Sequence, residues 1–554
     1  MSENPTPVTL SRRGFIGAAG AGALAVGLPL VARAGSADAA SPAFRHGVAS
    51  GDPLSGAVIL WTRVTPSPDA TPGSGRGGAS TVTWEVATAR SFDEIVASGS
   101  TSTDAGRDHT VKVDATGLGP ATVYFYRFRV TGGPAAGAMS PIGRTKTAPA
   151  AGADVAEARF GVVSCSNWEA GYFSSYRFLA GRSDLDAVIH LGDYIYEYGP
   201  GEYGGKNGAV RRHSPAHDIV SLADYRIRHG QYKSDPDTQA VHGRHPFIVT
   251  WDDHEAANDQ WAHGAENHKP SQGPWAPRKA HADQAYFEWM PVRPVVSADN
   301  RHIYRRLAYG KLLELSMLDL RTYRDISADQ FSRQSDDPSR TIMGAKQMAW
   351  VQGGIASSTA KWQIIGNSVM ISPFLIPPLD PKTTKPLTEL IGIPENGVAF
   401  GGDDWNGYVA DRKRLLDAID HAGKKNVVFI TGDIHMSWAN DIPRTPANYP
   451  AAGTVATEFV VPSVTSNNID DILDVPPHTV GDVAAEAIKV TNHHTRWVNT
   501  DDHGYGVMTV TPAAAQMDWY FVNDLADRRT GQRYAQSWKV KSGTRRMTKA
   551  ARSS

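Results

Sequence analysis

Short apolar runs rich in β-branched and aromatic residues recur between residues 43 and 148. Clusters of Gly, Pro and Ser separate three prominent runs, which are 57–64 (AVILWTRV), 81–87 (TVTWEVA) and 123–130 (VYFYRFRV). Runs of this length bounded by turn-forming residues predict closely spaced strands. We therefore predict an all-β domain over 43–148, a sandwich of the immunoglobulin or fibronectin kind.

The pattern changes after the small-residue linker 147–154 (TAPAAGAD). Short apolar runs then alternate with longer segments of helical periodicity, such as 278–290 and 408–421. This alternation predicts a layered domain of α+β or α/β class, which we place at 155–524. The last segment, 525–554, is polar, basic and poor in apolar residues. Such a composition predicts a tail; a helix lying on the preceding domain is the alternative.

The stretch 186–198 (DAVIHLGDYIYEY) is the clearest candidate for a functional site. Its apolar run 187–191 has the length and composition of a buried strand. Gly192 ends the run, Asp193 follows at its carboxyl end, and Tyr196 comes three residues later. Ligand sites in open α/β sheets form just outside the carboxyl ends of strands. The alternative is a loop in which Asp193 only caps the next turn.

Other apolar runs also end in side chains that can bind metals. These side chains are Cys165; Asp252, Asp253 and His254; Asn367; and Asp433 and His435. Thiolate, imidazole and phenolate suit iron or zinc, whereas carboxylate and amide oxygens suit calcium, magnesium or manganese. A strand-end Asp is often only a turn residue. Several such strand ends together predict a mixed metal centre, in which Asp193 could bridge both kinds of ion.

The first forty residues predict an export signal rather than part of the fold. Paired arginines in 11–16 (SRRGFI) precede an Ala/Gly-rich run, and 37–39 (ADA) offers a cleavage site. This arrangement is typical of twin-arginine signals. We expect recognition by the twin-arginine export machinery, cleavage near Ala39 or Ala40, and a secreted mature protein. An uncleaved membrane anchor is the alternative.

Composition limits the partners and the possible cross-links. A chain of 554 residues is too long for a single hydrophobic core, so we expect two or more domains. The formal net charge of −1 indicates no nucleic-acid partner. We expect a monomer. The lone cysteine, Cys165, cannot form an intramolecular disulfide, so it is either a small core residue or a functional thiol.

Several of these motifs resemble those of a known family. The spacing Gly192-Asp193-x-x-Tyr196, the pair Asp253-His254 and 432–435 (GDIH) are similar to those of the binuclear metallophosphoesterases. Four further motifs are similar to those of the alkaline phosphatase D family, including its N-terminal β-domain: 44–53 (FRHGVASGDP), 165–167 (CSN), 251–255 (WDDHE) and 318–324 (LDLRTYR). The resemblance covers nearly the whole chain after the signal and implies a metallophosphatase-type catalytic domain.

The resemblance also implies a ligand set. Iron(III) would be held by Cys165, Asp193, Tyr196 and His435. One or two calcium ions would share Asp193 and take Asp253 and Asp433, with Asn258 as a further candidate. Manganese, magnesium or zinc are possible substitutes. His254 matches the position beside the leaving group, whereas Arg321 and Asn367 match less closely and are not expected to be ligands.

The implied activity is hydrolysis of phosphoric esters by a metal-bound hydroxide or water, with Asp193 and His254 as the catalytic residues. Coordinated water ionises far more readily than bulk water, and a nearby imidazole can protonate or hold the departing alkoxide. Alternatively, His254 only orients Asp253. The expected substrates are small phosphate monoesters or diesters.

Two other functions remain open. The first is a metal-dependent phospholipase D that acts on phospholipid head groups, since the chain lacks the HxK motif of ordinary phospholipases D. Aromatic residues near the motifs could surround the quaternary ammonium of such a head group, namely Trp168, Tyr172, Tyr198, Trp251 and Trp261. The second is a secreted binding protein whose metals are structural and coordinatively closed.

Overall fold

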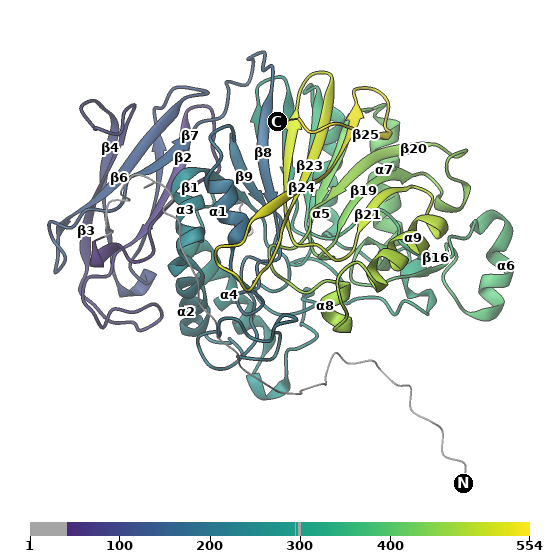
Figure 1. The fold of residues 1–554 in the computed structure, drawn as a ribbon, viewed down its shortest axis with the longest axis horizontal. Coiled ribbons are helices and arrows are strands. Elements are labelled where there is room, and N and C mark those ends of the chain that lie inside the picture. The colour runs from purple at the N-terminus through teal and green to yellow at the C-terminus, as the bar shows by residue number, and fades with distance from the viewer. Residues whose placement is uncertain (1–40, 294, 297–300, 554) are drawn as a thin grey trace, which may run out of the picture. The chain divides into compact units, whose positions relative to one another are not determined.

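The computed structural model describes residues 41–293, 295–296 and 301–553, and two large β-sheets organise them (Figure 1). The predicted export signal, residues 1–40, lies outside the described residues. Within the described part of the chain, no helix combines the length and the apolar content that crossing a bilayer requires.

The N-terminal region is all-β, as predicted. A four-stranded sheet of order β4-β3-β6-β7 contributes one layer. Its apolar face packs against β2 and β5, and the shared core contains Val58, Leu60, Val86, Tyr126 and Phe128. The strands of this region are β1 (Val48–Gly51), β2 (Ala57–Arg63), β3 (Ser80–Ala87), β4 (Ile95–Thr103), β5 (Thr110–Thr116), β6 (Val123–Gly132) and β7 (Gly143–Lys146).

The second layer of this region, formed by β5, β2 and β1, continues into the sheet of the following region. Strand β1 pairs in parallel with β10 (Pro246–Val249), so β5-β2-β1 continue a ten-stranded sheet of order β25-β24-β23-β22-β8-β9-β10-β1-β2-β5. Gly51 is needed at this junction, because a Cβ there would lie 1.9 Å from the carbonyl oxygen of Pro291. The N-terminal region and the region that follows it therefore share one sheet.

The region after the N-terminal strands has four layers, in which two sheets lie between two layers of helices. A seven-stranded sheet of order β13-β14-β15-β18-β20-β19-β21 packs on the ten-stranded sheet. Helices α1 to α4 cover the outer face of the ten-stranded sheet, and α5 and α7 cover that of the other. The predicted mixture of α+β and α/β layers is confirmed.

The remaining strands and helices have the following bounds. The strands are β8 (Ala158–Val163), β9 (Ala187–His190), β11 (Val295–Val296), β12 (Arg301–His302), β13 (Arg305–Tyr309), β14 (Leu313–Met317), β15 (Trp362–Asn367), β16 (Leu375–Ile376), β17 (Val398–Ala399), β18 (Val427–Thr431), β19 (Ser437–Pro443), β20 (Thr454–Val460), β21 (Thr495–Asn499), β22 (Gly504–Val510), β23 (Ala514–Val522), β24 (Gln532–Lys541) and β25 (Met547–Lys549). The α-helices are α1 (Ser174–Ala180), α2 (Leu222–Ser234), α3 (Pro236–Arg244), α4 (Trp275–Trp289), α5 (Gly344–Ser357), α6 (Pro381–Ile391), α7 (Val409–His421), α8 (Ile469–Leu473) and α9 (Val480–Thr491). Short 3₁₀ helices are η1 (Pro42–Phe44), η2 (Ala105–Arg107), η3 (Pro270–Gln272), η4 (Arg333–Asp336), η5 (Trp405–Gly407) and η6 (Pro446–Asn448).

The C-terminal segment is not the tail predicted from its polarity, nor the alternative helix. Strand β24 pairs antiparallel with β23 along its length, and β25 follows at the edge of the ten-stranded sheet. Only Val540 and Met547 of these two strands are fully buried among apolar core residues, with Ala535 and Trp538 partly buried. Because most positions of β24 are polar and exposed or half-buried, the composition of the segment concealed the strands.

The strand ends meet as predicted. Strands β8, β9 and β10 run parallel in one sheet, and β15 and β18 run parallel in the other. The loops after β8, β9, β10 and β18 carry Cys165, Asp193, Asp252 and Asp433 respectively. The fold therefore delivers these side chains to one edge of the two packed sheets.

Candidate metal centre

The backbone is strained at four predicted ligands. Cys165, Asp193, Asp433 and His435 have φ values of 59°, 55°, 64° and 62°, in the left-handed region that residues with side chains rarely adopt. Such positions cost about 1–3 kcal/mol each and persist only where surrounding contacts fix them. The loop after β8 is fixed to the loop after β9, because the N–H of Cys165 donates to the carbonyl of Gly192 at 3.1 Å.

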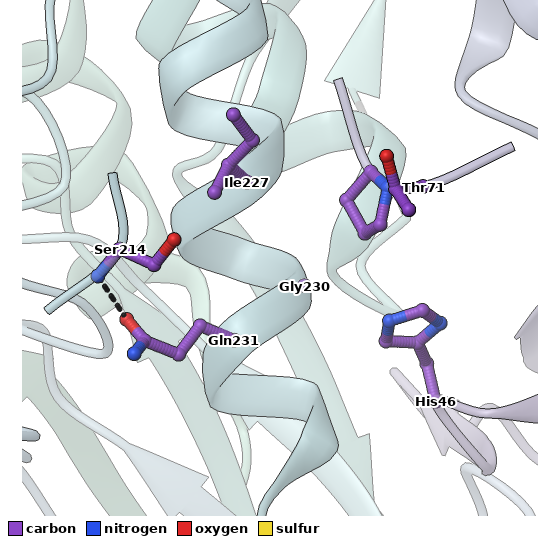
Figure 2. Close-up of a pocket in the computed structure, with 7 residues that line it drawn as sticks. His46, Thr71, Ser214, Ile227, Gly230 and Gln231 are labelled. Atoms are coloured by element: carbon purple, nitrogen blue, oxygen red, sulfur yellow. Dashed lines mark hydrogen bonds between the residues drawn. The ribbon is translucent and has the colours of Figure 1, made fainter. Parts of the chain in front are cut away.

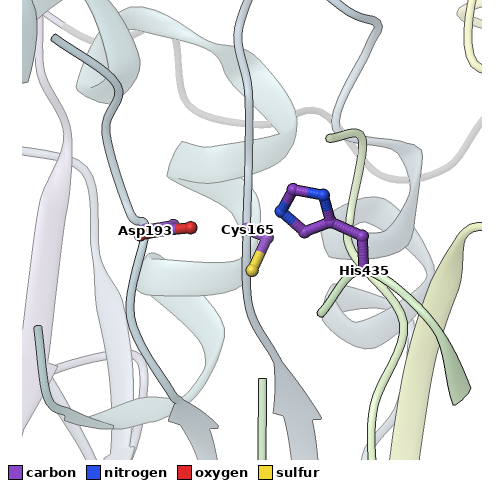
Figure 3. A group of neighbouring side chains, drawn as sticks. All are labelled: Cys165, Asp193 and His435. Carbon is purple, nitrogen blue, oxygen red and sulfur yellow. The ribbon is translucent and has the colours of Figure 1, made fainter. Parts of the chain in front are cut away.

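One group of donors combines sulfur, oxygen and nitrogen. Ligand atoms of Cys165, Asp193 and His435 lie within 4.8 Å of one another (Figure 3). The Tyr196 hydroxyl joins them, since it donates to Asp193 Oδ2 at 3.0 Å and lies 3.5 Å from His435 Nε2. On the far side of the imidazole, Nδ1 lies 2.6 Å from the carbonyl of Asn467. That contact leaves Nε2 facing the other three donors.

A second group contains mainly carboxylates. Ligand atoms of Asp252, Asp253 and Asp433 lie within 4.8 Å of one another, and so do those of Asp193, Asp253 and His254. Asp193 thus belongs both to the sulfur-containing group and to a carboxylate group. Its Oδ1 atom is buried without a hydrogen-bond partner among the described residues. A bound cation would satisfy that oxygen, so the donor set fits a metal centre.

Arg321 is fully buried beside the carboxylates. Its Nε and Nη2 atoms bind the two oxygens of Asp252 at 2.5 and 2.8 Å. The same guanidinium lies 3.3 Å from Asp433, 3.7 Å from Asp253 and 3.5 Å from Asp403. Arg321 therefore engages both oxygens of Asp252 but only one oxygen of Asp433. The oxygens of Asp253 accept from the backbone N–H groups of His254 and Asp259, which leaves lone pairs for an ion. Asp403 was not singled out from the sequence, because its importance arises from its contact with Arg321, which lies far away in the chain.

Burial sets the electrostatics of the group. Burial raises the pKa of Asp193 and that of Asp433 well above the usual range, and neighbouring carboxylates add to both shifts. Burial likewise raises the pKa of the Cys165 thiol, and Asp193 adds to it. Burial also opposes ionisation of Asp253, but Arg321 and His254 outweigh it and lower its pKa. Clustered acids of this kind are stabilised in their ionised form by a cation.

His254 lies beside these carboxylates. Burial opposes its charged form, but Asp253, Glu197 and Asp193 outweigh burial and raise the pKa of His254. Its Nδ1 atom is 2.7 Å from Glu197 Oε2. Sequence reasoning did not single out Glu197, although it directly follows Tyr196; only its contact with the distant loop of His254 reveals its importance.

Two other residues considered from the sequence have defined surroundings. The backbone N–H of Asn258 donates to Glu197 Oε1 at 2.7 Å, and its side-chain Nδ2 donates to Glu266 at 3.2 Å. Its role as a calcium ligand stays a prediction. Asn367 accepts from the indole of Trp405 at 3.0 Å, which is a structural role.

Three of the aromatic residues considered for binding a quaternary ammonium pack against other parts of the protein. Trp168 and Tyr172 pack around the guanidinium of Arg211, at 3.8 and 5.1 Å from their ring centroids. Trp251 is buried in the core against Tyr286 and Phe287. Tyr198, in contrast, does lie beside His254, with ring centroids 5.5 Å apart.

A surface pocket of about 400 Å³ lies elsewhere, between α2 and the N-terminal region (Figure 2). None of its lining residues belongs to the metal-ligand groups, so it is not the candidate centre. Gln231 of α2 closes one side by accepting from the backbone N–H of Ser214 at 2.9 Å. The pocket is lined by His46, Thr71, Pro72, Ser214, Ile227, Gly230 and Gln231.

Comparison with known families now identifies the relationship. A family model described as PhoD-like phosphatase matches residues 160–519, and the model of the PhoD-like phosphatase N-terminal domain matches residues 30–149. The chain belongs to the PhoD-like phosphatase family. It is accordingly a metal-dependent phosphoester hydrolase with an N-terminal all-β domain and a mixed α/β catalytic domain.

Individual relatives agree with this membership. Alkaline phosphatase D of Bacillus subtilis (strain 168) is 37% identical over 527 residues, covering 92% of this chain and 84% of the relative. A solved PhoD structure is 34% identical and covers 93% of both chains with a TM-score of 0.80. A purple acid phosphatase from yellow lupin (Lupinus luteus) is 12% identical, covers 89% of this chain and 73% of its own, and has a TM-score of 0.50, which shows similarity of fold.

Proposed function

We propose that this PhoD-like phosphatase hydrolyses small phosphate monoesters and diesters at an iron–calcium centre. In this proposal Cys165, Asp193, Tyr196 and His435 hold iron(III), and calcium shares Asp193. The other calcium ligands are Asp253 and Asp433, with Asn258 as a further candidate. The observation that carries the proposal is the position of Asp193, which belongs to both donor groups.

The two donor groups favour different ions. Thiolate, phenolate and imidazole suit iron, whereas a set of carboxylate oxygens suits calcium and also accepts magnesium or manganese. When bound, the ions would polarise the phosphoryl group and lower the pKa of a coordinated water. Arg321 holds Asp252 and lies beside Asp253 and Asp433, so it maintains the spacing of the carboxylates.

His254 is proposed to assist the leaving group. As a water-derived oxygen forms a bond to phosphorus and releases its proton to solvent, the bond between phosphorus and the ester oxygen breaks, and the electron pair of that bond moves to the ester oxygen. The Nε2 proton of the imidazolium then passes to the departing oxygen, and the neutral imidazole later regains a proton from water. General acid catalysis of this kind typically contributes about 10²–10⁴-fold to the rate.

The decisive experiment compares three substrates with one preparation of the exported protein. Hydrolysis of p-nitrophenyl phosphate and of its bis-ester, well above hydrolysis of phosphatidylcholine, is the expected result. Preferential release of choline from phosphatidylcholine would instead identify a phospholipase D and overturn the proposed substrate class. Absence of hydrolysis in metal-loaded protein would overturn the proposed function as a whole.

We also propose twin-arginine export followed by secretion, on the evidence of the motif in residues 11–16, and we expect the secreted protein to be a monomer. Replacing both Arg12 and Arg13 by Lys is expected to retain the protein, and its phosphatase activity, inside the cell. Unchanged export of the double variant would contradict this route. Light scattering of the secreted protein tests the monomer.

A further inference from the structure

Glu197 is a fully buried carboxylate whose oxygens all have partners. Oε2 lies 2.7 Å from Nδ1 of His254. Oε1 accepts from the backbone N–H of Asn258 at 2.7 Å and from the side-chain amide of Asn267. An ionised carboxylate only accepts hydrogen bonds, so Nδ1 of His254 carries the donated proton.

The ring of His254 is also held on its faces. Its centroid lies 4.2 Å from that of Tyr196, with the planes inclined by 31°. Tyr203 lies parallel to it at 6.3 Å, and Tyr198 is inclined to it at 5.5 Å. These three rings limit rotation of the imidazole out of its plane. The carboxylate of Glu197 fixes the remaining freedom, namely which nitrogen faces the metal ligands.

We propose that Glu197 is the positioning residue of the leaving-group histidine: by holding Nδ1–H of His254, it directs Nε2 towards the departing ester oxygen. This inference rests on the proposed function of His254. Mutation of a carboxylate that orients a functional imidazole commonly lowers activity by about 10–100-fold. Glu197 also follows Tyr196 and binds the backbone of Asn258, so the same carboxylate fixes the loop after β9 relative to the loop after β10.

Glu197→Gln tests the role with two esters that differ in leaving group. Glutamine has one acceptor oxygen and cannot serve His254, Asn258 and Asn267 together. An alkyl phosphate releases a strongly basic alkoxide that needs a proton, whereas p-nitrophenolate leaves without one. We expect kcat to fall by about 10–100-fold for the alkyl ester and by no more than about threefold for the nitrophenyl ester. Equal losses for both esters would overturn the proposal.

A double-mutant cycle separates positioning from general structural damage. If Glu197 acts only through His254, adding Glu197→Gln to His254→Ala is expected to cause no further loss on the alkyl ester. Losses that multiply would overturn the proposal. Wild-type protein that hydrolyses neither ester would instead show failure of the proposed function itself.

Two more variants keep the test informative if Glu197→Gln folds poorly. Asn267→Ala leaves the carboxylate in place but removes one of its restraints, and we expect a smaller loss that is again confined to the alkyl ester. An unchanged ratio of the two rates in Asn267→Ala would overturn the proposal. Glu169→Gln is the matched control, because Glu169 is also buried and accepts from the backbone N–H groups of Gly201 and His213. In Glu169→Gln, the ratio of the rates on the alkyl ester and the nitrophenyl ester is expected to equal that of the wild type.

Discussion

At the scale of single residues, Cys165 distinguishes this centre from one made only of oxygen and nitrogen ligands. If the thiol binds iron, Cys165→Ala is expected to lose iron and most activity, and Cys165→Ser to bind iron poorly because its hydroxyl is a harder donor. Elemental analysis and ester hydrolysis on the same preparations provide the measurement. Retained iron with near-normal turnover, at a stability cost of only about 1 kcal/mol, would make Cys165 a core residue.

Arg321 supports a second prediction at the same scale. It is buried and neutralises Asp252, so Arg321→Met leaves that carboxylate unpaired. We expect the free energy of unfolding of metal-free protein to fall by about 3–5 kcal/mol. Chemical denaturation in the presence of a chelator measures this change. Arg321→Lys keeps the charge but loses the paired hydrogen bonds to Asp252, so its free energy of unfolding is expected to lie between those of the wild type and Arg321→Met. If Arg321→Met were as stable as the wild type, the pairing of Arg321 with Asp252 would be contradicted.

At the scale of elements, apolar runs predicted the strands that lead to the site because those strands are buried on both faces. Strand β9 is fully buried, and its sequence is apolar enough to be recognised without partners. Strand β24 was missed because most of its positions are polar and exposed or half-buried. Glu197 and Asp403 were missed for another reason, since their importance arises from contacts with loops far away in the sequence. Patterns near each residue carry no information about such contacts.

Helix α2 carries an unusual buried amine, Lys233. Its Nζ lies 2.9 Å from His242 Nε2 and over the rings of Trp61 and Tyr194. Burial lowers the pKa of Lys233 well below 10.5. The unfolded chain therefore binds more protons than the folded chain between the lowered value and about pH 10.5, and stability rises with pH across that window.

Lys233→Met is expected to remove this penalty. The variant should melt at a higher temperature than the wild type at pH 7, by an amount equivalent to about 1.4 kcal/mol for each unit of lowered pKa. Thermal melts at pH 7 and pH 9.5 measure it, with the gap between the two proteins narrowing at the higher pH. A variant that is less stable at pH 7 would show that the contacts of the amine outweigh its desolvation.

At the scale of the whole molecule, the shared sheet joins the N-terminal and catalytic regions. Strand β1 pairs with β10, and Asp52 at the end of this strand binds the buried guanidinium of Arg305 through both oxygens. We therefore expect one cooperative unfolding transition for the described part of the chain, and a lower transition temperature in Asp52→Asn because the charge pair is broken. Two separate calorimetric transitions would contradict this coupling.

The most direct test of the central claim is the metal content of Asp193→Asn. Asp193 is the carboxylate common to the sulfur-containing and the carboxylate groups, so removal of its charge is expected to weaken both positions. Elemental analysis of wild type and variant, purified in parallel, gives iron and calcium per chain. The account predicts that the variant loses both metals together with activity. Wild-type content of either metal in Asp193→Asn would contradict a centre bridged by this residue.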